Sequence, residues 1–289
     1  MTSVAVVGLG EMGARFAKRF LDEGHEVIVW SRSSDKALPL IALGAEPAAD
    51  PAEAARRAEV VVTMVSDPAA LRAVTEGTIG VLAGADRSTT LIDMSTVGPA
   101  AVSRLASLLP TDVELLDAPV LGSLSEAESG SLSIFVGGPA SLVDRWTPLL
   151  SALGSPIHVG PLGAGATAKL VANLTLFGSL AVFGEALSLA RGLGLSDDAA
   201  FEVLGRTPSA VQAERRRPSI ESGDYPVRFP LRLARKDADL IADAATAVGL
   251  DLRLASAAQT WLAQAEDEGW GDRDYSTALK MVLGDRRRE

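Results

Sequence analysis

The sequence predicts an α/β protein with a doubly wound, mainly parallel sheet, followed by an all-helical part that a long inter-domain helix joins to it. Two patterns support this prediction. Up to about residue 162, short apolar runs alternate with amphipathic stretches, as in strands linked by crossover helices. After residue 163, strand-like runs stop and Ala- and Leu-rich segments with helical spacing follow. We therefore expect domains over residues 1–162 and 163–289.

The strands expected in the first domain are mostly apolar on successive residues. Such runs indicate burial on both faces, as in a parallel sheet that helices cover on both sides. The expected strands are residues 4–7, 26–30, 60–64, 90–93, 114–117, 133–136 and 156–159.

The second domain is expected to begin with one long helix over residues 164–193, which exceeds the usual length of a globular helix. From Leu170 to Leu193 this helix is apolar on most sides, so its own domain, the first domain or a second chain must cover it. We expect a homodimer that buries this region together with the C-terminal helices. Further helices are expected at residues 197–204, 231–248, 254–268 and 275–283.

Charge and composition limit the classes of partner. The 289 residues carry a formal net charge of −10, which leaves no general basic surface for nucleic acid. The basic clusters at residues 215–217 and 286–288 are expected to be solvated surface.

The apolar run near the N-terminus is too short to span a bilayer. Cysteine is absent, which fits a reducing compartment. We expect a cytoplasmic protein with no membrane or nucleic-acid partner.

Metal chemistry is not expected. The sequence contains two histidines, His25 and His158, and each is isolated from other metal-ligating residues. No cluster of carboxylates offers a substitute, so no metal ligand is assigned.

A glycine cluster follows the first expected strand and precedes an amphipathic helix, with the pattern G-x-G-x-x-G. The first glycine permits the turn, the second lets the backbone approach a pyrophosphate, and the third lets helix and strand pack closely. The N–H groups and the positive end of the helix would face the phosphates. We interpret the cluster as a dinucleotide site; a structural turn is the alternative. The residues assigned to this site are Gly8, Leu9, Gly10, Glu11, Met12 and Gly13.

The residues after the second expected strand, Ser31, Arg32 and Ser33, indicate which cofactor binds. An NAD site usually carries an acidic residue here, which binds the ribose hydroxyls. A guanidinium flanked by hydroxyls suits the dianionic 2′-phosphate of NADP(H) instead. We expect NADP(H) to be preferred. The alternative is that Arg32 is an ordinary surface residue and that Asp35 binds the ribose of NAD(H).

Two further segments follow expected strands at the carboxyl edge of the sheet, where open α/β folds bind ligands. Met64, Val65 and Ser66 end or follow one strand, and Ser95 and Thr96 follow the next. We expect the first three residues to line the cofactor; a plain loop is the alternative.

Five stretches in a fixed order span nearly the whole chain and match one pattern. They are VAVVGLGEMG at 4–13, DMSTVGP at 93–99, DAPVLGS at 117–123 with GSLSIFVGG at 130–138, GAGATAKLVANL at 163–174 and FPLRLARKDADL at 229–240. In these stretches the chain resembles the β-hydroxyacid dehydrogenases, the family of 3-hydroxyisobutyrate dehydrogenase, tartronate semialdehyde reductase and the glyoxylate/succinic semialdehyde reductases. The resemblance implies a Rossmann-type first domain and a dimeric NAD(P)-dependent oxidoreductase.

Lys169 and Asn173 lie four residues apart in the expected long helix, so both side chains lie on one face. Reduction of a carbonyl by hydride needs a proton donor at the developing alkoxide, and an ammonium group can supply both the proton and charge stabilisation. The resemblance implies that Lys169 is the general acid/base and that Asn173 helps to place it and the substrate. The alternative is a pair of polar residues on a surface helix.

The resemblance also assigns roles to three other residues. It implies that Ser95 and Thr96 lie near the substrate and the nicotinamide, and that Lys236 of a Lys-Asp pair lies close to the cofactor or substrate. A solvated surface lysine is the alternative for Lys236.

One stretch departs from the commonest family pattern. Where many members have Ser-Gly-Gly after DAPV to hold the substrate carboxylate, this chain has Leu121, Gly122 and Ser123. A backbone N–H anion site is compatible with this change, and Ser123 restores a hydroxyl one residue later. Leu121 removes a polar contact and fills volume, so a bulkier or less polar carbonyl compound is the alternative substrate. We assign these three residues to the substrate site.

The function expected from these observations is an NADP-dependent dehydrogenase or reductase that acts on the CH–OH group of a small β-hydroxyacid or on the carbonyl of a semialdehyde. Imine reductases share the two-domain plan but typically lack a lysine at the position of Lys169, so C=N reduction is an alternative. A non-catalytic NADP-binding regulatory protein is a third hypothesis, against which the presence of Lys169 and Asn173 argues.

Overall fold

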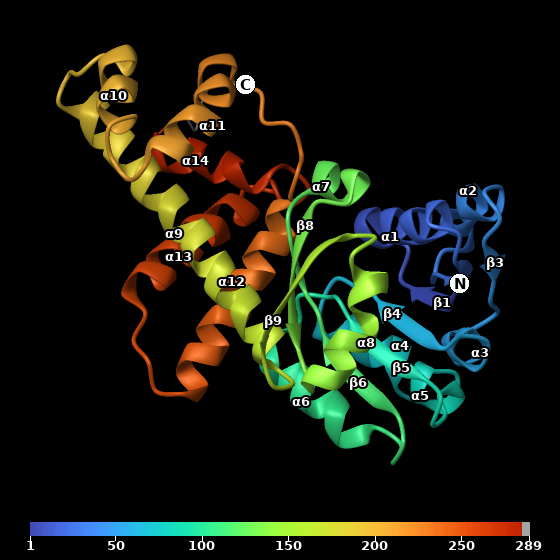
Figure 1. Ribbon diagram of the computed structural model, residues 1–289. Helices are drawn as coiled ribbons and strands as arrows, with labels where there is room; N and C mark the ends of the chain where they lie inside the picture. Colours follow the sequence, from blue (N-terminus) through green and yellow to red (C-terminus); the bar gives the residue numbers. More distant parts are fainter. Residues whose placement is uncertain (285–289) are drawn as a thin grey trace. The chain divides into compact units, whose positions relative to one another are not determined.

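The computed structural model describes residues 1–284. The chain divides into two compact units, with the boundary along the chain between Lys169 and Leu170. Unit 1, which ends at Lys169, is a sheet with helices on both faces, and unit 2 is helical (Figure 1). An α/β fold with a doubly wound sheet followed by an all-helical part, as predicted from the sequence, is therefore confirmed.

The sheet of unit 1 reverses its strand order at β1, which pairs with β2 on one side and with β4 on the other. The full order is β3-β2-β1-β4-β5-β6-β8-β7, with β9 paired to β8. All pairs are parallel except those of β8 with β6 and with β7. In such sheets, ligands bind at the reversal, outside the carboxyl ends of the strands. The strands are β1 (Ser3–Val7), β2 (Glu26–Trp30), β3 (Glu46–Pro47), β4 (Val60–Thr63), β5 (Thr90–Asp93), β6 (Glu114–Asp117), β7 (Val120–Leu121), β8 (Leu132–Gly137) and β9 (Gly154–Gly160).

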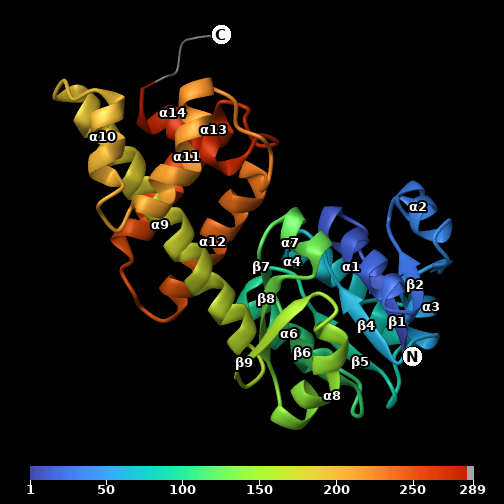
Figure 2. The same ribbon diagram turned by 45° about the horizontal axis from the view of Figure 1, so that its top comes forward.

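Alternate residues of β1 pack into two different core layers, which explains why the strand is apolar throughout. Val4 and Val6 belong to one layer and Ala5 and Val7 to the other, and all four are fully buried. Helices α1, α2, α7 and α8 contribute to the first layer and α3 to α6 to the second (Figure 2). The helices are α1 (Glu11–Asp22), η1 (Ser34–Ala37), α2 (Leu38–Ile41), α3 (Pro51–Arg56), α4 (Pro68–Thr75), α5 (Val81–Gly84), α6 (Gly98–Leu108), α7 (Leu124–Ser129) and α8 (Ala140–Leu150).

Unit 2 is built around helix α9 (Ala164–Gly192), which begins in unit 1. The expected helix at residues 275–283 is a short 3₁₀ turn followed by a helix, and one further helix, α11, was not predicted. The other elements are α10 (Asp197–Leu204), α11 (Ala210–Ser222), α12 (Leu231–Ala247), α13 (Arg253–Asp267), η2 (Tyr275–Thr277) and α14 (Ala278–Val282).

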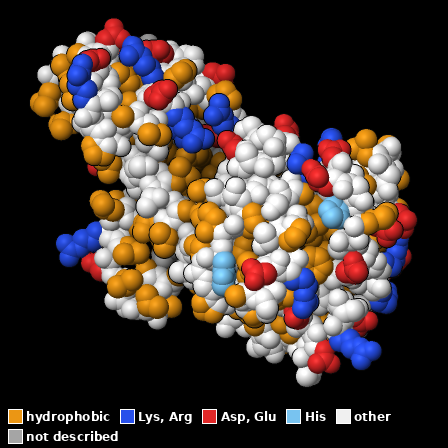
Figure 3. Space-filling model, viewed as in Figure 1, with side chains coloured by type: hydrophobic (Ala, Val, Ile, Leu, Met, Phe, Trp, Pro, Cys, Tyr) orange, Lys and Arg blue, Asp and Glu red, His pale blue; other side chains and the backbone are white. Residues whose placement is uncertain are grey.

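The prediction that the basic cluster at 215–217 is solvated surface was wrong for Arg216. This side chain is 5% exposed, and its guanidinium donates to the hydroxyl of Tyr275 at 2.5 Å and lies 3.9 Å from Asp274. The cluster at 286–288 lies outside the described residues. On the face drawn in Figure 3, Lys and Arg side chains are interspersed with Asp and Glu.

By length and composition, helix α9 is apolar enough to cross a membrane, with a mean hydropathy of 1.6 over its most apolar window. The core helix of a soluble protein meets the same criteria. Phe177, Leu180, Phe183 and Leu187 are buried in the core of unit 2. Packing on the other helices of unit 2 thus accounts for these four side chains, whereas 39% of the apolar window as a whole is buried.

Two glycines of the turn after β1 are required by close backbone contacts. Gly8 has a φ of +104°, and a β-carbon there would lie 2.4 Å from the carbonyl oxygen of Met64. A β-carbon at Gly13 would lie 1.9 Å from the carbonyl oxygen of Gly8. At Gly10, in contrast, a β-carbon would meet no atom within 4 Å. The fold therefore requires Gly8 and Gly13, whereas it leaves space at Gly10.

We predict that Gly13→Ala lowers the free energy of unfolding by about 3 kcal/mol, because the new methyl group overlaps the backbone of Gly8. Gly10→Ala is the matched control and should change it by less than about 1 kcal/mol. Urea denaturation of both variants checks this. Equal stability of the two variants would contradict the assignment of Gly13 to backbone packing.

Candidate active site

The turn between β1 and α1 presents backbone N–H groups at a helix start. Gly10 is the N-cap of α1 and makes no side-chain capping bond. The carboxylate of Glu11 is turned to Arg15, whose Nη1 lies 2.9 Å away. Leu9 is buried and Met12 packs on the core, so both contribute their backbone rather than their side chains to the turn surface. This arrangement fits a pyrophosphate, which needs N–H donors and close backbone approach.

The residues expected to select the cofactor lie at the carboxyl end of β2. Arg32 and Ser33 are exposed, and Ser31 is half-buried. Asp35, in the first turn of η1, is also exposed. Arg32 and Asp35 are therefore both accessible to a ribose or its phosphate.

A buried carboxylate joins the loops after β4 and β5. Oδ1 of Asp93 accepts hydrogen bonds from the Thr63 hydroxyl at 2.7 Å and from the backbone N–H of Ser95 at 3.2 Å. The Ser95 hydroxyl in turn accepts from the backbone N–H of Val65 at 3.0 Å. Ser95, expected near the substrate, is 1% exposed and bridges the two loops. Neither Thr63 nor Asp93 was assigned from the sequence, although Asp93 begins one of the matching stretches.

The other loop residues lie at the surface. Met64, Val65 and Thr96 are half-buried, and Ser66 is exposed, with its hydroxyl donating to Asp67 at 2.6 Å. Asp67 also caps α4 by accepting from the backbone N–H of Ala70. These contacts fix the loop after β4 at the same sheet edge as the glycine turn.

Burial raises the pKa of Asp93 to about 6. Its Oδ2 is buried without a hydrogen-bond partner. In the sheet register, Asp93 stands beside Asp117 of β6, whose charge adds to the rise in the pKa of Asp93. Two carboxylates thus end neighbouring strands of the sheet.

Lys169 is half-buried in the second turn of α9. Asn173 follows four residues later and is 1% exposed. Because both residues lie in one continuous helix, their side chains share a face, as the spacing predicted.

In unit 2, Asp237 connects two of the predicted site residues. Its Oδ2 accepts a hydrogen bond from Nδ2 of Asn173 at 2.7 Å, and its Oδ1 pairs with Nζ of Lys236 at 2.5 Å. Oδ1 of Asn173 remains buried without a hydrogen-bond partner. The sequence indicated the Lys-Asp pair, but it gave no sign that Asp237 binds Asn173, because α9 and α12 are far apart in the chain.

In the segment at residues 121–123, the polar donors of Ser123 are engaged by a carboxylate of the chain. Ser123 forms a capping box with Glu126: the Ser123 N–H and hydroxyl approach Oε2 of Glu126 at 2.8 and 2.5 Å. Gly122 has a φ of +143°, and Leu121 is 38% exposed. The loop therefore presents an apolar side chain, while the Ser123 donors bind a carboxylate of the chain itself.

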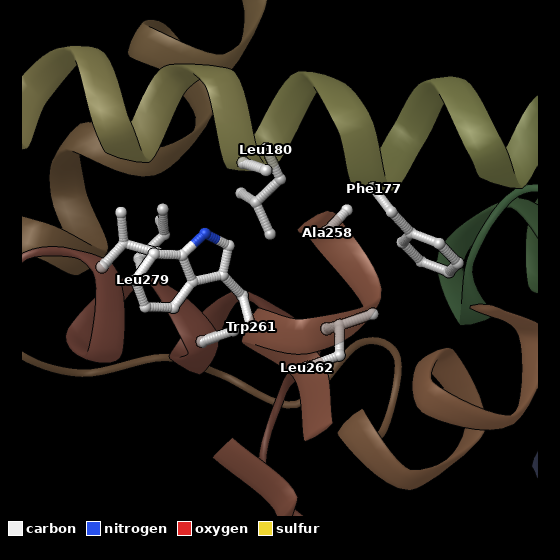
Figure 4. Close-up of a pocket in the computed structure, with 9 residues that line it drawn as sticks. Phe177, Leu180, Ala258, Trp261, Leu262 and Leu279 are labelled. Carbon is white, nitrogen blue, oxygen red and sulfur yellow. The ribbon is translucent and has the colours of Figure 1, made fainter. Parts of the chain in front are cut away.

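An apolar pocket in unit 2 lies between α9, α13 and α14 (Figure 4). It is lined by Phe177, Leu180, Trp261, Leu262 and Leu279, among others, and none of its lining residues is ionisable. The indole N–H of Trp261 donates to Glu185 at 3.1 Å. The pocket offers packing surface but no acid, base or nucleophile.

Within residues 1–284, no group of His, Cys, Asp and Glu side chains is arranged to hold a metal ion.

Models of two protein families match nearly the whole chain. The model of the NAD-binding domain of 6-phosphogluconate dehydrogenase matches residues 3–163. The model described as the NAD-binding domain of NADP-dependent 3-hydroxyisobutyrate dehydrogenase matches residues 163–282. Together with the glycine turn and the sheet reversal, these matches define a two-domain NAD(P)-dependent oxidoreductase.

Several characterised relatives are similar over their full length. The chain is 33% identical to 3-sulfolactaldehyde reductase of Escherichia coli, covering 98% of this chain and 96% of the relative. It is also 33% identical to 3-hydroxyisobutyrate dehydrogenase of Pseudomonas aeruginosa, covering 98% and 99%. The structure of Mycobacterium tuberculosis 3-hydroxyisobutyrate dehydrogenase with L-serine superposes with a TM-score of 0.89 at 30% identity, covering 98% and 99%. The chain belongs to the β-hydroxyacid dehydrogenase family.

Imine reductases are more distant. The enzyme from Myxococcus stipitatus has a TM-score of 0.69 and 20% identity, covering 98% of this chain and 99% of that one. This likeness concerns the fold alone.

We predict that Asp93 makes stability depend on pH. Because burial raises its pKa from 3.8 to about 6, the folded protein binds a proton there that the unfolded chain has lost. Its contribution to the free energy of unfolding therefore falls by up to about 3 kcal/mol as the pH rises from 4 to 6. Asp93→Asn stays neutral and lacks this loss. Urea denaturation should therefore show that the free energy of unfolding of the variant, relative to that of wild type, is higher at pH 7 than at pH 4.

Asp86→Asn is the control for this measurement. Asp86 is exposed, and hydrogen bonds from Ser88 lower its pKa below the ordinary 3.8, so its titration lies below the range from pH 4 to pH 7 and its replacement should leave the pH dependence in this range nearly unchanged. A stability difference between Asp93→Asn and wild type that is the same at both pH values would contradict the buried carboxyl's role.

Proposed function

We propose that this chain transfers a hydride between NADP(H) and the carbonyl or hydroxyl carbon of a small β-hydroxyacid or semialdehyde, with Lys169 as the general acid/base. The observation that carries the proposal is the pair Lys169 and Asn173 on one face of α9, in a chain whose first unit has the dinucleotide turn. The named relatives act on sulfolactaldehyde and 3-hydroxyisobutyrate, which supports this reaction class.

The residues of unit 1 fit a dinucleotide. The open space at Gly10 and the N-terminus of α1, which no side chain caps, suit the pyrophosphate. Met64, Val65 and Thr96 would line the nicotinamide end, at the sheet edge that Asp93 organises. In unit 2, Lys236 would add positive charge toward the cofactor. When bound, the dihydronicotinamide supplies the hydride to the carbonyl carbon.

Lys169 would handle the proton. As the carbonyl is reduced, its oxygen gains the electron pair of the C=O π bond, and the Nζ ammonium donates a proton to it. In the oxidative direction the neutral amine accepts that proton. Asn173 would orient this exchange, because Asp237 binds its Nδ2 and leaves the buried Oδ1 as an acceptor for the ammonium or the substrate hydroxyl.

Residues 121–123 would contact the rest of the substrate, and Ser95 would hold the loops beside it. Leu121 would supply an apolar contact and the backbone N–H of Gly122 would supply a donor, while Ser123 binds Glu126. Ser95 acts through the loops that it bridges. This arrangement favours substrates that place part of an aliphatic chain against Leu121.

We also propose that the protein is a cytoplasmic homodimer. Helix α9 leaves Val171, Val182 and Leu189 between 48% and 64% exposed, which is a surface that a second copy would cover. The absence of cysteine fits a reducing compartment.

We predict that Lys169→Ala lowers kcat for carbonyl reduction by about 100-fold or more, because the alkoxide loses its proton donor. The affinity for NADPH, followed by fluorescence titration, should not change. Lys18→Ala is the control: it removes an exposed ammonium that pairs with Asp22 and should leave kcat at the wild-type value. Comparable turnover by wild type and Lys169→Ala would exclude this residue as the acid.

We predict that wild type prefers NADPH and that Arg32→Ala weakens NADPH binding by about tenfold or more, since a charge-assisted contact to the 2′-phosphate is lost. The affinity for NADH should remain unchanged. Asp35→Asn distinguishes the alternative: if Asp35 binds the ribose, this variant loses NADH affinity. A wild-type preference for NADH would overturn the assignment of Arg32.

A further inference from the structure

Asp117 ends strand β6, and its side chain binds the first turn of helix α9. Oδ1 accepts a hydrogen bond from the N–H of Gly163 at 2.8 Å, and Oδ2 accepts one from Ala166 at 2.6 Å. Asp117 is 1% exposed. The first turn of a helix leaves such N–H groups without partners inside the helix, and a carboxylate is a strong acceptor for them. The sheet therefore holds α9 by its first turn.

Close backbone packing limits movement of this turn. A β-carbon at Gly165 would lie 2.4 Å from the carbonyl oxygen of Phe135 and 2.5 Å from that of Asp117. A β-carbon at Gly137 would lie 2.3 Å from Oδ1 of Asp117 and 2.8 Å from the nitrogen of Gly165. The backbone of α9 thus lies directly against the ends of β6 and β8, with no side chain between them.

Lys169 lies three residues after Ala166, which corresponds to about 4.5 Å along the helix axis. Its position is consequently set by the orientation of the first turn. A tilt of that turn moves the ammonium group, and a displacement of about 1 Å in a reacting group can cost about 100-fold in rate.

We propose that Asp117 is a positioning residue, which fixes the first turn of α9 and through it the place of Lys169. It does not touch the substrate, and the inference rests on the proposed function of Lys169 as the acid/base. Burial raises the pKa of Asp117, while the hydrogen bonds from Ala166 and Gly163 oppose that rise. These two bonds therefore favour the ionised form, which accepts at both oxygens.

The first test compares Asp117→Ala with Asp50→Ala. Asp50 caps α3 by accepting from the N–H of Glu53 at 2.7 Å, so its replacement removes the same kind of bond elsewhere in unit 1. Asp117→Ala should lower kcat by about 100-fold and leave the affinity for NADPH unchanged. Asp50→Ala should retain the wild-type kcat.

A double-mutant cycle with Lys169→Ala separates positioning from a general structural role. If Asp117 acts through Lys169, then Asp117→Ala causes no further loss of kcat in the Lys169→Ala background. A residue that only stabilises the fold would lower kcat by the same factor in both backgrounds. Purely additive effects would therefore overturn the proposal.

Gly165→Ala provides a second route if Asp117→Ala does not fold. It keeps Asp117, but its β-carbon would lie 2.4 Å from the carbonyl oxygen of Phe135 and 3.0 Å from Oδ2 of Asp117, so the first turn must shift away from both. The same loss of kcat with unchanged NADPH affinity supports the proposal, and wild-type kcat in this variant overturns it.

The results for Lys169→Ala separate failure of the proposed function from failure of the positioning role of Asp117. If Lys169→Ala keeps wild-type turnover, the acid/base assignment fails and the inference fails with it. If Lys169→Ala is inactive while Asp117→Ala and Gly165→Ala keep the wild-type kcat, only the positioning role of Asp117 is excluded.

Discussion

Asp117 ends strand β6 with a buried carboxylate that accepts hydrogen bonds from Gly163 and Ala166, so the sheet and helix α9 share one polar contact. This contact can form only because glycine at 137 and 165 lets the backbones meet. Helix α9 then carries Lys169 and Asn173 on one face. The chemistry that we propose therefore depends on where a strand ends and on how a helix starts.

A second buried carboxylate organises the neighbouring loops. Asp93 ends β5 beside Asp117 and joins Thr63 to the Ser95 loop. Burying an ionisable group costs free energy, and this cost appears as the pKa of about 6 at Asp93. A folded chain that bears such a cost must recover it from packing, and the apolar layers on both faces of β1 supply that packing.

The sequence predicted the fold and the long helix because both produce strong local patterns: continuous apolar runs in strands and Ala- and Leu-rich helical spacing. It did not predict β3 or β7, which are two residues long and leave no pattern. Helix α11 was missed because its sequence is polar and contains Pro218, and Arg216 within it is buried against Tyr275. The hydrogen bond between Asn173 and Asp237 could not be predicted from local sequence patterns either, because it joins residues that are distant in the sequence. The cofactor and substrate assignments remain predictions.

A crystal structure of the protein with NADP⁺ and a hydroxyacid decides whether Lys169 faces the reacting carbon. We expect Nζ of Lys169 within about 3 Å of the substrate hydroxyl oxygen, with the nicotinamide C4 facing the carbon that bears it. A complex in which that ammonium points into bulk water, out of hydrogen-bond reach of the hydroxyl even through one water molecule, would exclude Lys169 as the general acid/base.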